Sequence, residues 1–271
     1  MRARTGLIVV SMGLALAGCA RERAIAKVAI TPPRAASLDE VLAAYDRYCT
    51  EARTLSASGD LDVRDLRAGK ARKLGVRLVA ARGGRLYLKG TVAVVTALEV
   101  VADGGRFWFQ VPSKKTVWMG GAAEAAPTAA ETADAPYYAL RPADVTSALL
   151  PEPLAPETGE TVLMEADREA FSLAVARVEG GRGRVRRRVW LDRQTLRPSR
   201  LRLYDERGDV RTEATLAGWT GGGPQRVDIA RPLEGYEASF SFDRVESNVP
   251  VPDRAFAPRT PADYKVVEVG K

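Results

Sequence analysis

The strongest constraint on the fold is a two-residue alternation of apolar and polar side chains that recurs through the second half of the sequence. Side chains of successive strand residues point to opposite faces of a sheet, so this period is typical of β-strands with one covered face. Three segments predict an apolar face opposite an arginine-rich or polar face. In the first, Val185, Arg187, Val189 and Leu191 alternate with Arg186, Arg188 and Trp190. In the second, Leu201 and Leu203 alternate with Arg200, Arg202 and Tyr204, and in the third, Ala238, Phe240 and Phe242 alternate with Ser239, Ser241 and Asp243.

Strand patterns separated by glycine-rich turns cover most of the chain, which indicates a mainly β, antiparallel meander. Gly83-Gly84 and Asp103-Gly104 are signals for tight hairpins. The strands are expected over residues 55–63, 74–80, 85–89, 97–102, 105–111, 115–119, 161–165, 169–179, 184–192, 199–205, 210–217, 225–231 and 236–247.

Two helices are predicted. Ser37 and Glu40 have the spacing of a capping box, and apolar residues follow at helical spacing over residues 38–53. A shorter helix is expected over residues 142–150, with Pro142 in its first turn and Pro151 ending it. Residues 121–136 are rich in Ala, Glu and Thr and predict a loop or a weak surface helix. Two short helices cover only part of a large sheet, so a cavity is expected beneath them.

The first twenty residues read as a secretory signal. Arg2 and Arg4 precede an apolar stretch, and the stretch ends in Leu16-Ala17-Gly18-Cys19. The apolar stretch is too short to span a bilayer, which takes about 20 apolar residues. The ending resembles the bacterial lipobox, which implies a diacylglycerol on the Cys19 thiol and cleavage just before it. The alternative is an ordinary signal peptide with an incidental cysteine.

Acylation at Cys19 predicts a protein that lies on a membrane without spanning it, because two or more acyl chains give stable attachment. Ala20 is compatible with export to the outer membrane, so we expect a lipid-anchored protein there that faces the periplasm. The expected organisation is a signal peptide over residues 1–18, a lipidated tether over 19–36 and one domain over 37–271. The tether is expected to be extended, since it contains Pro32-Pro33 and no sustained apolar period.

Composition excludes several function classes. The formal net charge is +7, and loss of Arg2 and Arg4 with the signal leaves a mildly basic chain, so an anionic lipid surface is a better partner than nucleic acid. The chain has no histidine, which removes the usual general base and the commonest metal ligand. We therefore expect no catalytic residue, no metal and no cofactor. Cys49 has no partner if Cys19 is acylated, and a buried inert thiol is expected.

Three segments carry a family resemblance. They are Trp190–Gly208, which has a strand-turn-strand pattern; Ala102–Trp118, which contains a DG-x-x-x-W hairpin; and Val251–Phe256, which contains P-D-x-x-F. Together they resemble the periplasmic lipoprotein-carrier superfamily, which includes the carrier LolA, the lipobox-containing receptor LolB and related lipoprotein-sorting proteins. The chain is longer than typical receptors, and residues 121–160 have no clear counterpart in the family.

The resemblance implies an incomplete β-barrel of about eleven strands, with helices capping its open side and a cavity that accepts acyl chains. It implies non-covalent binding of a lipid or an acylated lipoprotein, in aid of sorting to the outer membrane. The expected cavity residues, which ordinary sheet core would explain equally well, are Leu86, Leu88, Phe107, Phe109, Leu201, Leu203, Phe240 and Phe242.

The receptor type in this family has a protruding apolar loop that touches the membrane, and Val92, Val94 and Val95 lie at the matching place. The alternative is that these valines continue a buried strand. For the whole protein, the alternative function is a structural or regulatory envelope lipoprotein that binds a protein partner.

Overall fold

The computed structural model describes residues 32–121 and 140–269, and Pro33–Lys271 form one compact unit. Its main element is a single sheet of fourteen strands. The strands are β1 Thr54–Asp65, β2 Lys70–Ala81, β3 Arg85–Val92, β4 Val95–Asp103, β5 Arg106–Val111, β6 Thr116–Gly121, β7 Glu160–Ala166, β8 Ala170–Glu179, β9 Arg182–Asp192, β10 Pro198–Tyr204, β11 Val210–Thr220, β12 Gly223–Arg231, β13 Tyr236–Ser247 and β14 Lys265–Glu268.

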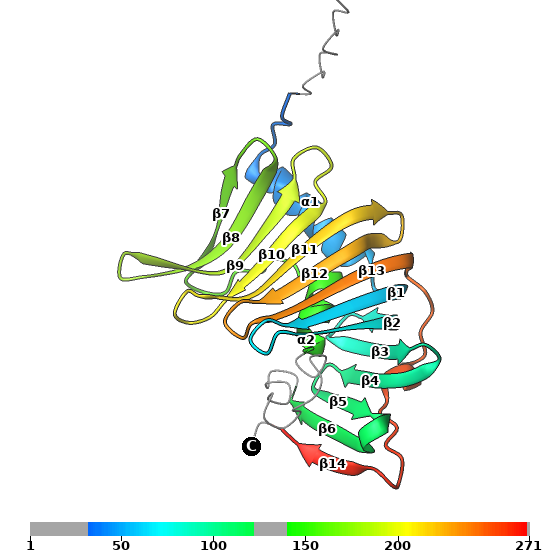
Figure 1. Ribbon diagram of the computed structural model, residues 1–271. Coiled ribbons are helices and arrows are strands. Elements are labelled where there is room, and N and C mark those ends of the chain that lie inside the picture. Colours follow the sequence, from blue (N-terminus) through cyan, green and yellow to red (C-terminus); the bar gives the residue numbers. More distant parts are fainter. Residues whose placement is uncertain (1–31, 122–139, 270–271) are drawn as a thin grey trace, which may run out of the picture. The chain divides into compact units, whose positions relative to one another are not determined.

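Two meanders join to make this sheet. Strands β1 to β6 follow one another as neighbours, as do β7 to β13, and β13 pairs with β1 to connect the two halves (Figure 1). All pairs are antiparallel except β14 with β6. The sheet is open, with β14 and β7 at its edges in the described part of the chain. The predicted mainly β, antiparallel fold is confirmed, but the expected count of about eleven strands is too low.

Both predicted helices are present. In α1, Leu38–Glu51, the Ser37 hydroxyl accepts a hydrogen bond from the Glu40 N–H at 3.3 Å, and the Glu40 carboxylate accepts one from the Ser37 N–H at 2.7 Å. This confirms the capping box. The second helix, α2, covers Pro142–Leu149 and lies with α1 on one side of the sheet (Figure 1). Within residues 32–121 and 140–269 there are also two short 3-10 turns, η1 Pro112–Lys114 and η3 Asp253–Phe256.

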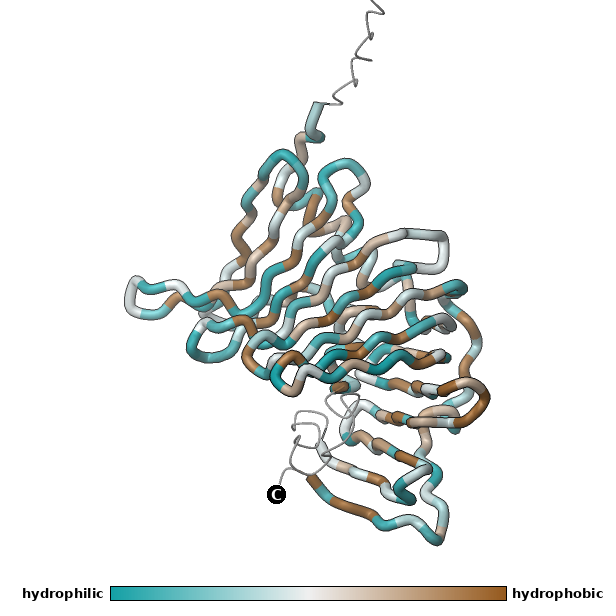
Figure 2. Tube along the Cα trace, viewed as in Figure 1, coloured by the Kyte–Doolittle hydropathy of each residue, from teal (hydrophilic) through white to brown (hydrophobic). Residues whose placement is uncertain are grey.

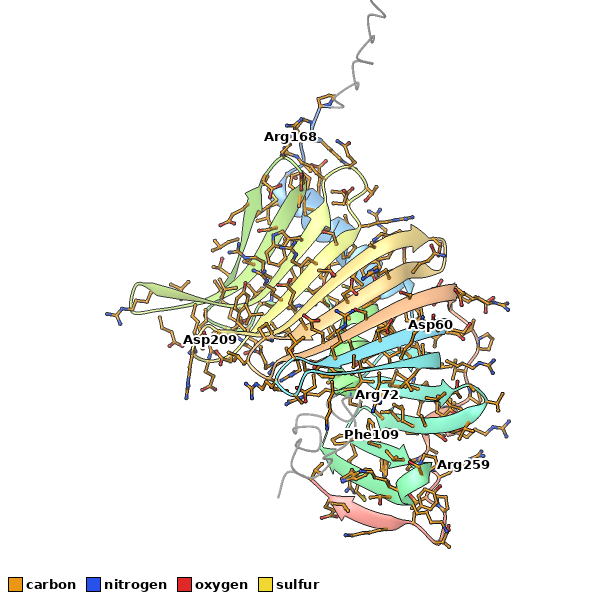
Figure 3. All side chains as sticks on the ribbon, viewed as in Figure 1. Asp60, Arg72, Phe109, Arg168, Asp209 and Arg259 are labelled. Atoms are coloured by element: carbon orange, nitrogen blue, oxygen red, sulfur yellow. The ribbon has the colours of Figure 1, made fainter. Side chains whose placement is uncertain are left out.

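The core lies between the helices and the apolar face of the sheet. Buried side chains of both meanders belong to one hydrophobic cluster with Val41, Tyr45 and Cys49 of α1 and Val145 of α2. The alternation of hydrophobic and hydrophilic residues along the strands is visible in Figure 2. Phe109 of β5, labelled in Figure 3, is among the largest fully buried side chains.

The opposite face carries the expected arginines. The guanidinium carbons of Arg188, Arg200 and Arg202 lie 5.8, 5.4 and 5.3 Å from the ring centroid of the half-buried Trp190. Cations at this distance from an indole are attracted to the ring face. Arg188 also pairs with Glu165 at 3.1 Å, and Arg202 pairs with Glu213. The arginine-rich pattern of β9 and β10 thus forms a packed polar face.

A bulge at Gly59 bends the sheet where the two meanders meet. Ser58 pairs with Arg244 but Gly59 pairs with Phe242, so Asp243 is an extra residue on β13. A Cβ atom at Gly59 would lie 2.1 Å from the carbonyl oxygen of Ser241, which no larger residue tolerates without a backbone shift. Bulges increase local twist and bend a strand, consistent with a curved, unclosed sheet.

The signal peptide, Cys19 and nearly all of the 121–136 segment lie outside the described residues. Among the residues that are described, no helix is both long and apolar enough to cross a membrane.

Candidate ligand-binding site

Helix α2 lies over the centre of the apolar face and is attached there by a buried ion pair. The Asp144 carboxylate lies 2.8 Å from the Arg231 guanidinium of β12, and their side chains are only 8% and 4% exposed. Thr212 of β11 donates a hydrogen bond to the other Asp144 oxygen at 3.0 Å. Burial of two charges is costly unless they are paired and hydrogen-bonded. A different position of α2 would separate the two buried charges, so this contact favours the observed position of the helix.

Glu234, in the turn between β12 and β13, extends this network. Its carboxylate accepts from Arg231 at 2.7 Å and from Arg141, the residue before α2, at 2.8 Å. Burial raises the pKa of Glu234, but the hydrogen bond from Arg231 and the charges of both arginines outweigh it and hold the pKa below the ordinary 4.5. Burial likewise opposes the charge of Arg231, yet its contacts to Glu234 and Asp144 hold its pKa above the usual value.

Two further arginines hold the segment that leaves α2. Arg82, just after β2, donates to the carbonyl of Leu150 at 3.1 Å. Arg187 of β9 donates to the carbonyl of Glu152 at 2.7 Å, and the Tyr45 hydroxyl of α1 donates to the same carbonyl at 3.3 Å. Both ends of α2 are therefore attached to the sheet through polar contacts from the two meanders.

Of the cavities in the described part of the chain that border α2, two share its residue Ser147. The first has a volume of about 260 Å³ and lies between α2 and the turns after β2 and β4, where Gly84, Gly104, Phe107 and Ala143 line it. The second has a volume of about 100 Å³. It lies between α2 and strands β9 to β11, where its lining includes Ala148, Arg187, Leu201, Leu203 and Ala214. Ser147 and Glu152 belong to the walls of both.

The structure divides the predicted cavity residues into two groups. Phe107 lines the first cavity, and Leu201 and Leu203 line the second. The other five are buried in the core and line neither of these cavities: Leu86, Leu88, Phe109, Phe240 and Phe242. The alternation identified the apolar face correctly, while contact of these residues with a ligand stays a prediction.

The predicted membrane-contact valines are exposed. Val92, Val94 and Val95 are 54%, 95% and 67% exposed at the tip of the β3–β4 hairpin. Ala93 between them has a φ of 52°, a left-handed conformation that side chains other than glycine rarely adopt. The alternative that these valines continue a buried strand is therefore wrong.

The polar residues around α2 were not predicted as site residues. The alternation does indicate which polar residues lie on the apolar face. Arg187 lies on the same face of β9 as Val189 and Leu191, and Arg231 lies on the same face of β12 as Ile229. An arginine at an apolar-face position needs a specific partner inside the protein.

No protein-family model matches the sequence, and no curated protein is detectably similar to it. Among solved structures, a LolA superfamily protein from Nitrosomonas europaea matches with a TM-score of 0.51 at 10% identity, over 83% of this chain and 99% of its own. The chain has the fold of the LolA superfamily.

Two further structures agree with this assignment of the fold. An outer membrane lipoprotein-sorting protein domain from Vibrio parahaemolyticus matches with a TM-score of 0.50 at 13% identity, over 81% of this chain and 97% of its own. A DUF1329 family protein from Desulfovibrio piger matches with a TM-score of 0.53 at 15% identity, over 83% of this chain and 98% of its own. At these identities the LolA-like similarity establishes the fold and not the ligand.

Proposed function

We propose that the protein binds a lipid or the acyl chains of a lipoprotein non-covalently, between α2 and the apolar face of its LolA-like sheet. The observation that carries this proposal is the pair of cavities beside α2, with volumes of about 260 and 100 Å³. Their walls combine apolar side chains such as Phe107 and Leu201 with a few polar groups, the usual make-up of a site for a small amphiphile.

A long acyl chain fills more space than either cavity offers, so binding requires a shift of α2. The hydrogen bonds from Arg82 and Arg187 to the segment after α2 are contacts that water can replace, so the C-terminal end of α2 can move while the buried Asp144–Arg231 pair holds its first turn. The same face without α2 would be a large exposed apolar surface, which acyl chains would cover.

The test uses the chain without residues 1–19, which retains the whole compact unit Pro33–Lys271. A fluorescent fatty acid or bis-ANS should bind at a saturable site. Ser147 is an exposed residue in the walls of both cavities, so a large ring in Ser147→Trp should obstruct them and weaken binding about tenfold or more. Ser241→Trp is the matched control, because Ser241 is exposed on β13 at a position that alternates with the buried Phe240 and Phe242.

Lack of saturable probe binding, together with lack of copurifying lipid, would refute this function. A structural or regulatory role through a protein partner would then be the leading hypothesis. Unfolding curves of both tryptophan variants separate a blocked site from a damaged fold.

We also propose that Cys19 carries the acyl chains that attach the protein to the envelope, and that the protein acts in lipoprotein or lipid sorting at the outer membrane. The Leu16–Cys19 segment supports the acylation. Cys19→Ala should abolish incorporation of radiolabelled palmitate and leave the precursor uncleaved. Palmitate that still enters the Cys19→Ala protein would refute this assignment.

A further inference from the structure

Arg187 is a cation on the apolar face of the sheet. Its neighbours on that face of β9, Val189 and Leu191, are fully buried. Across the sheet it pairs in register with Leu203 of β10 and Val175 of β8. A charge at such a position is costly unless an opposite charge or several hydrogen bonds compensate for it.

The hydrogen bonds of Arg187 all go to uncharged oxygens, and its guanidinium carbon lies 5.8 Å from the centroid of the Tyr45 ring. Nη2 donates to the Tyr45 hydroxyl at 2.6 Å and to the Glu152 carbonyl at 2.7 Å, and Nη1 donates to the Pro153 carbonyl at 3.3 Å. Its Nε is buried and has no hydrogen-bond partner among the described residues. No carboxylate of the described residues lies within ion-pair distance of Arg187.

Three other arginines have the carboxylate partner that Arg187 lacks, although the Nε atoms of Arg188 and Arg231 are likewise buried without a hydrogen-bond partner among the described residues. Arg186 lies 2.6 Å from a Glu160 oxygen and Arg188 lies 3.1 Å from a Glu165 oxygen, both on the other face of β9. Arg231, also on the apolar face, has the Asp144 carboxylate at 2.8 Å. The charge of Arg187 thus lacks the compensation that the same side chain receives at these three positions.

Two cavities meet at this residue. The 100 Å³ cavity beside α2 and a second cavity of about 240 Å³ share Arg187 and Leu203 in their walls. The larger one is more polar, and its lining includes Tyr204, Arg211 and Glu160. Glu160 is already paired with Arg186, whereas Arg211 has no ion pair among the described residues. An apolar chamber therefore adjoins a polar chamber whose charged lining residues are Arg186, Arg187, Arg211, Glu157 and Glu160, and both glutamates pair with Arg186. The half-buried Arg187 and the exposed Arg211 have no carboxylate partner among the described residues.

We propose that the ligand of this site is an anionic amphiphile, with its apolar tail beside Leu201 and Leu203 and its carboxylate or phosphate on the guanidinium of Arg187, near Arg211. The proposal rests on the acyl-binding function proposed above and names the chemical class of the ligand. A guanidinium binds carboxylates and phosphates through charge-assisted hydrogen bonds.

The test compares ligands that share a tail and differ in charge, with the chain that lacks residues 1–19. The probes are 12-(9-anthroyloxy)stearic acid, its methyl ester, and a lysophosphatidate that competes with them. The acid should bind at least about tenfold more tightly than the ester, because one charge-assisted hydrogen bond corresponds to roughly that difference in affinity. Stronger competition by the lysophosphatidate than by stearate would identify a phosphate as the natural headgroup, and the reverse would identify a carboxylate.

Arg187→Met should remove the preference for the acid while ester binding stays within about threefold. Arg188→Met is the matched control, because Arg188 is the adjacent residue on the other face of β9 and lines neither of the two cavities, and this variant should keep the preference. Arg187→Lys keeps the charge and should retain part of the preference for the acid. This variant replaces Arg187→Met in the test if Arg187→Met does not fold.

Equal binding of acid and ester by the unaltered protein would overturn this proposal and leave the acyl-binding function standing. Retention of the preference in Arg187→Met would overturn the assignment to Arg187. Lack of binding by every probe would instead refute the acyl-binding function, and the headgroup proposal with it.

Discussion

At the scale of single residues, Cys49 illustrates how burial controls reactivity. The residue is 1% exposed at the packed face of α1, and burial raises the pKa of its thiol to about 11. The reactive thiolate is therefore scarce at neutral pH. In the chain without residues 1–19, Cys49 is the only cysteine, so DTNB should react only after unfolding. Cys49→Ala should cost about 1 kcal/mol in urea unfolding. A Cys49-linked dimer in unreduced extracts would contradict this assignment.

The pair of Asp144 and Arg231 is the residue-scale contact with the largest expected energy. Arg231→Met would leave the Asp144 carboxylate buried without its cation, so we expect a loss of about 3–5 kcal/mol in unfolding free energy. Arg226→Met is the control on the same strand, because the Arg226–Asp228 pair is more exposed and should contribute about 0–1 kcal/mol. Combining Arg231→Met with Asp144→Leu should recover much of the loss. Equal effects of Arg231→Met and Arg226→Met would contradict this ranking.

At the scale of elements, the attachment of α2 should weaken in acid. The pKa of Glu234 is lower in the folded protein than its ordinary 4.5, so its ion pairs contribute stability above that pH and lose it as the pH falls through the folded value. The midpoint of thermal unfolding should fall from pH 6 to about pH 3 by more in the unaltered chain than in Glu234→Gln. Identical pH profiles would show that this carboxylate does not contribute.

The β3–β4 hairpin tip is the element expected to touch the membrane. Val94 is 95% exposed, so Val94→Asp should change the unfolding free energy by no more than about 0.5 kcal/mol. An aspartate at an inserted tip would carry a charge into the bilayer interface and should reduce cosedimentation with phosphatidylethanolamine–phosphatidylglycerol vesicles. Val94→Leu serves as the control that keeps the tip apolar. Unchanged cosedimentation of Val94→Asp would exclude this contact.

At the scale of the whole molecule, the pairing of β1 with β13, which joins the two meanders, depends on the lack of a side chain at Gly59. Gly59→Ala would drive a Cβ atom against the β13 backbone and should cost about 3 kcal/mol or more, because the β1–β13 pairing must shift. Gly183→Ala in β9 is the matched control, since no atom lies within 4 Å of the added Cβ, and it should be nearly neutral. Equal stability of the two variants would show that the junction adapts.

The sequence predicts the fold better than it predicts the site. The thirteen strands from β1 to β13 follow from a local period and from turn glycines such as Gly83 and Gly84, both of which have positive φ. Strand β14 was missed because its four residues carry no turn signal and pair in parallel with β6. The cavity walls depend on where α2 lies, and that position is set by the contact of Asp144 with Arg231, far away in the sequence. Alternation alone does not distinguish a wall such as Leu201 from a filled core position such as Phe240.

The pairing of β1 with β13 also sets an order of events as the chain emerges, N-terminus first, where it folds. Each meander consists of strands that pair with the next in the chain, but β1 finds its second neighbour only when residues 236–247 have emerged. Until then the emerging chain exposes an unpaired strand edge beside a bare apolar surface, which is the arrangement most prone to aggregate. The emerging protein is therefore expected to depend on a holding chaperone until its thirteenth strand arrives, however fast the separate meanders form.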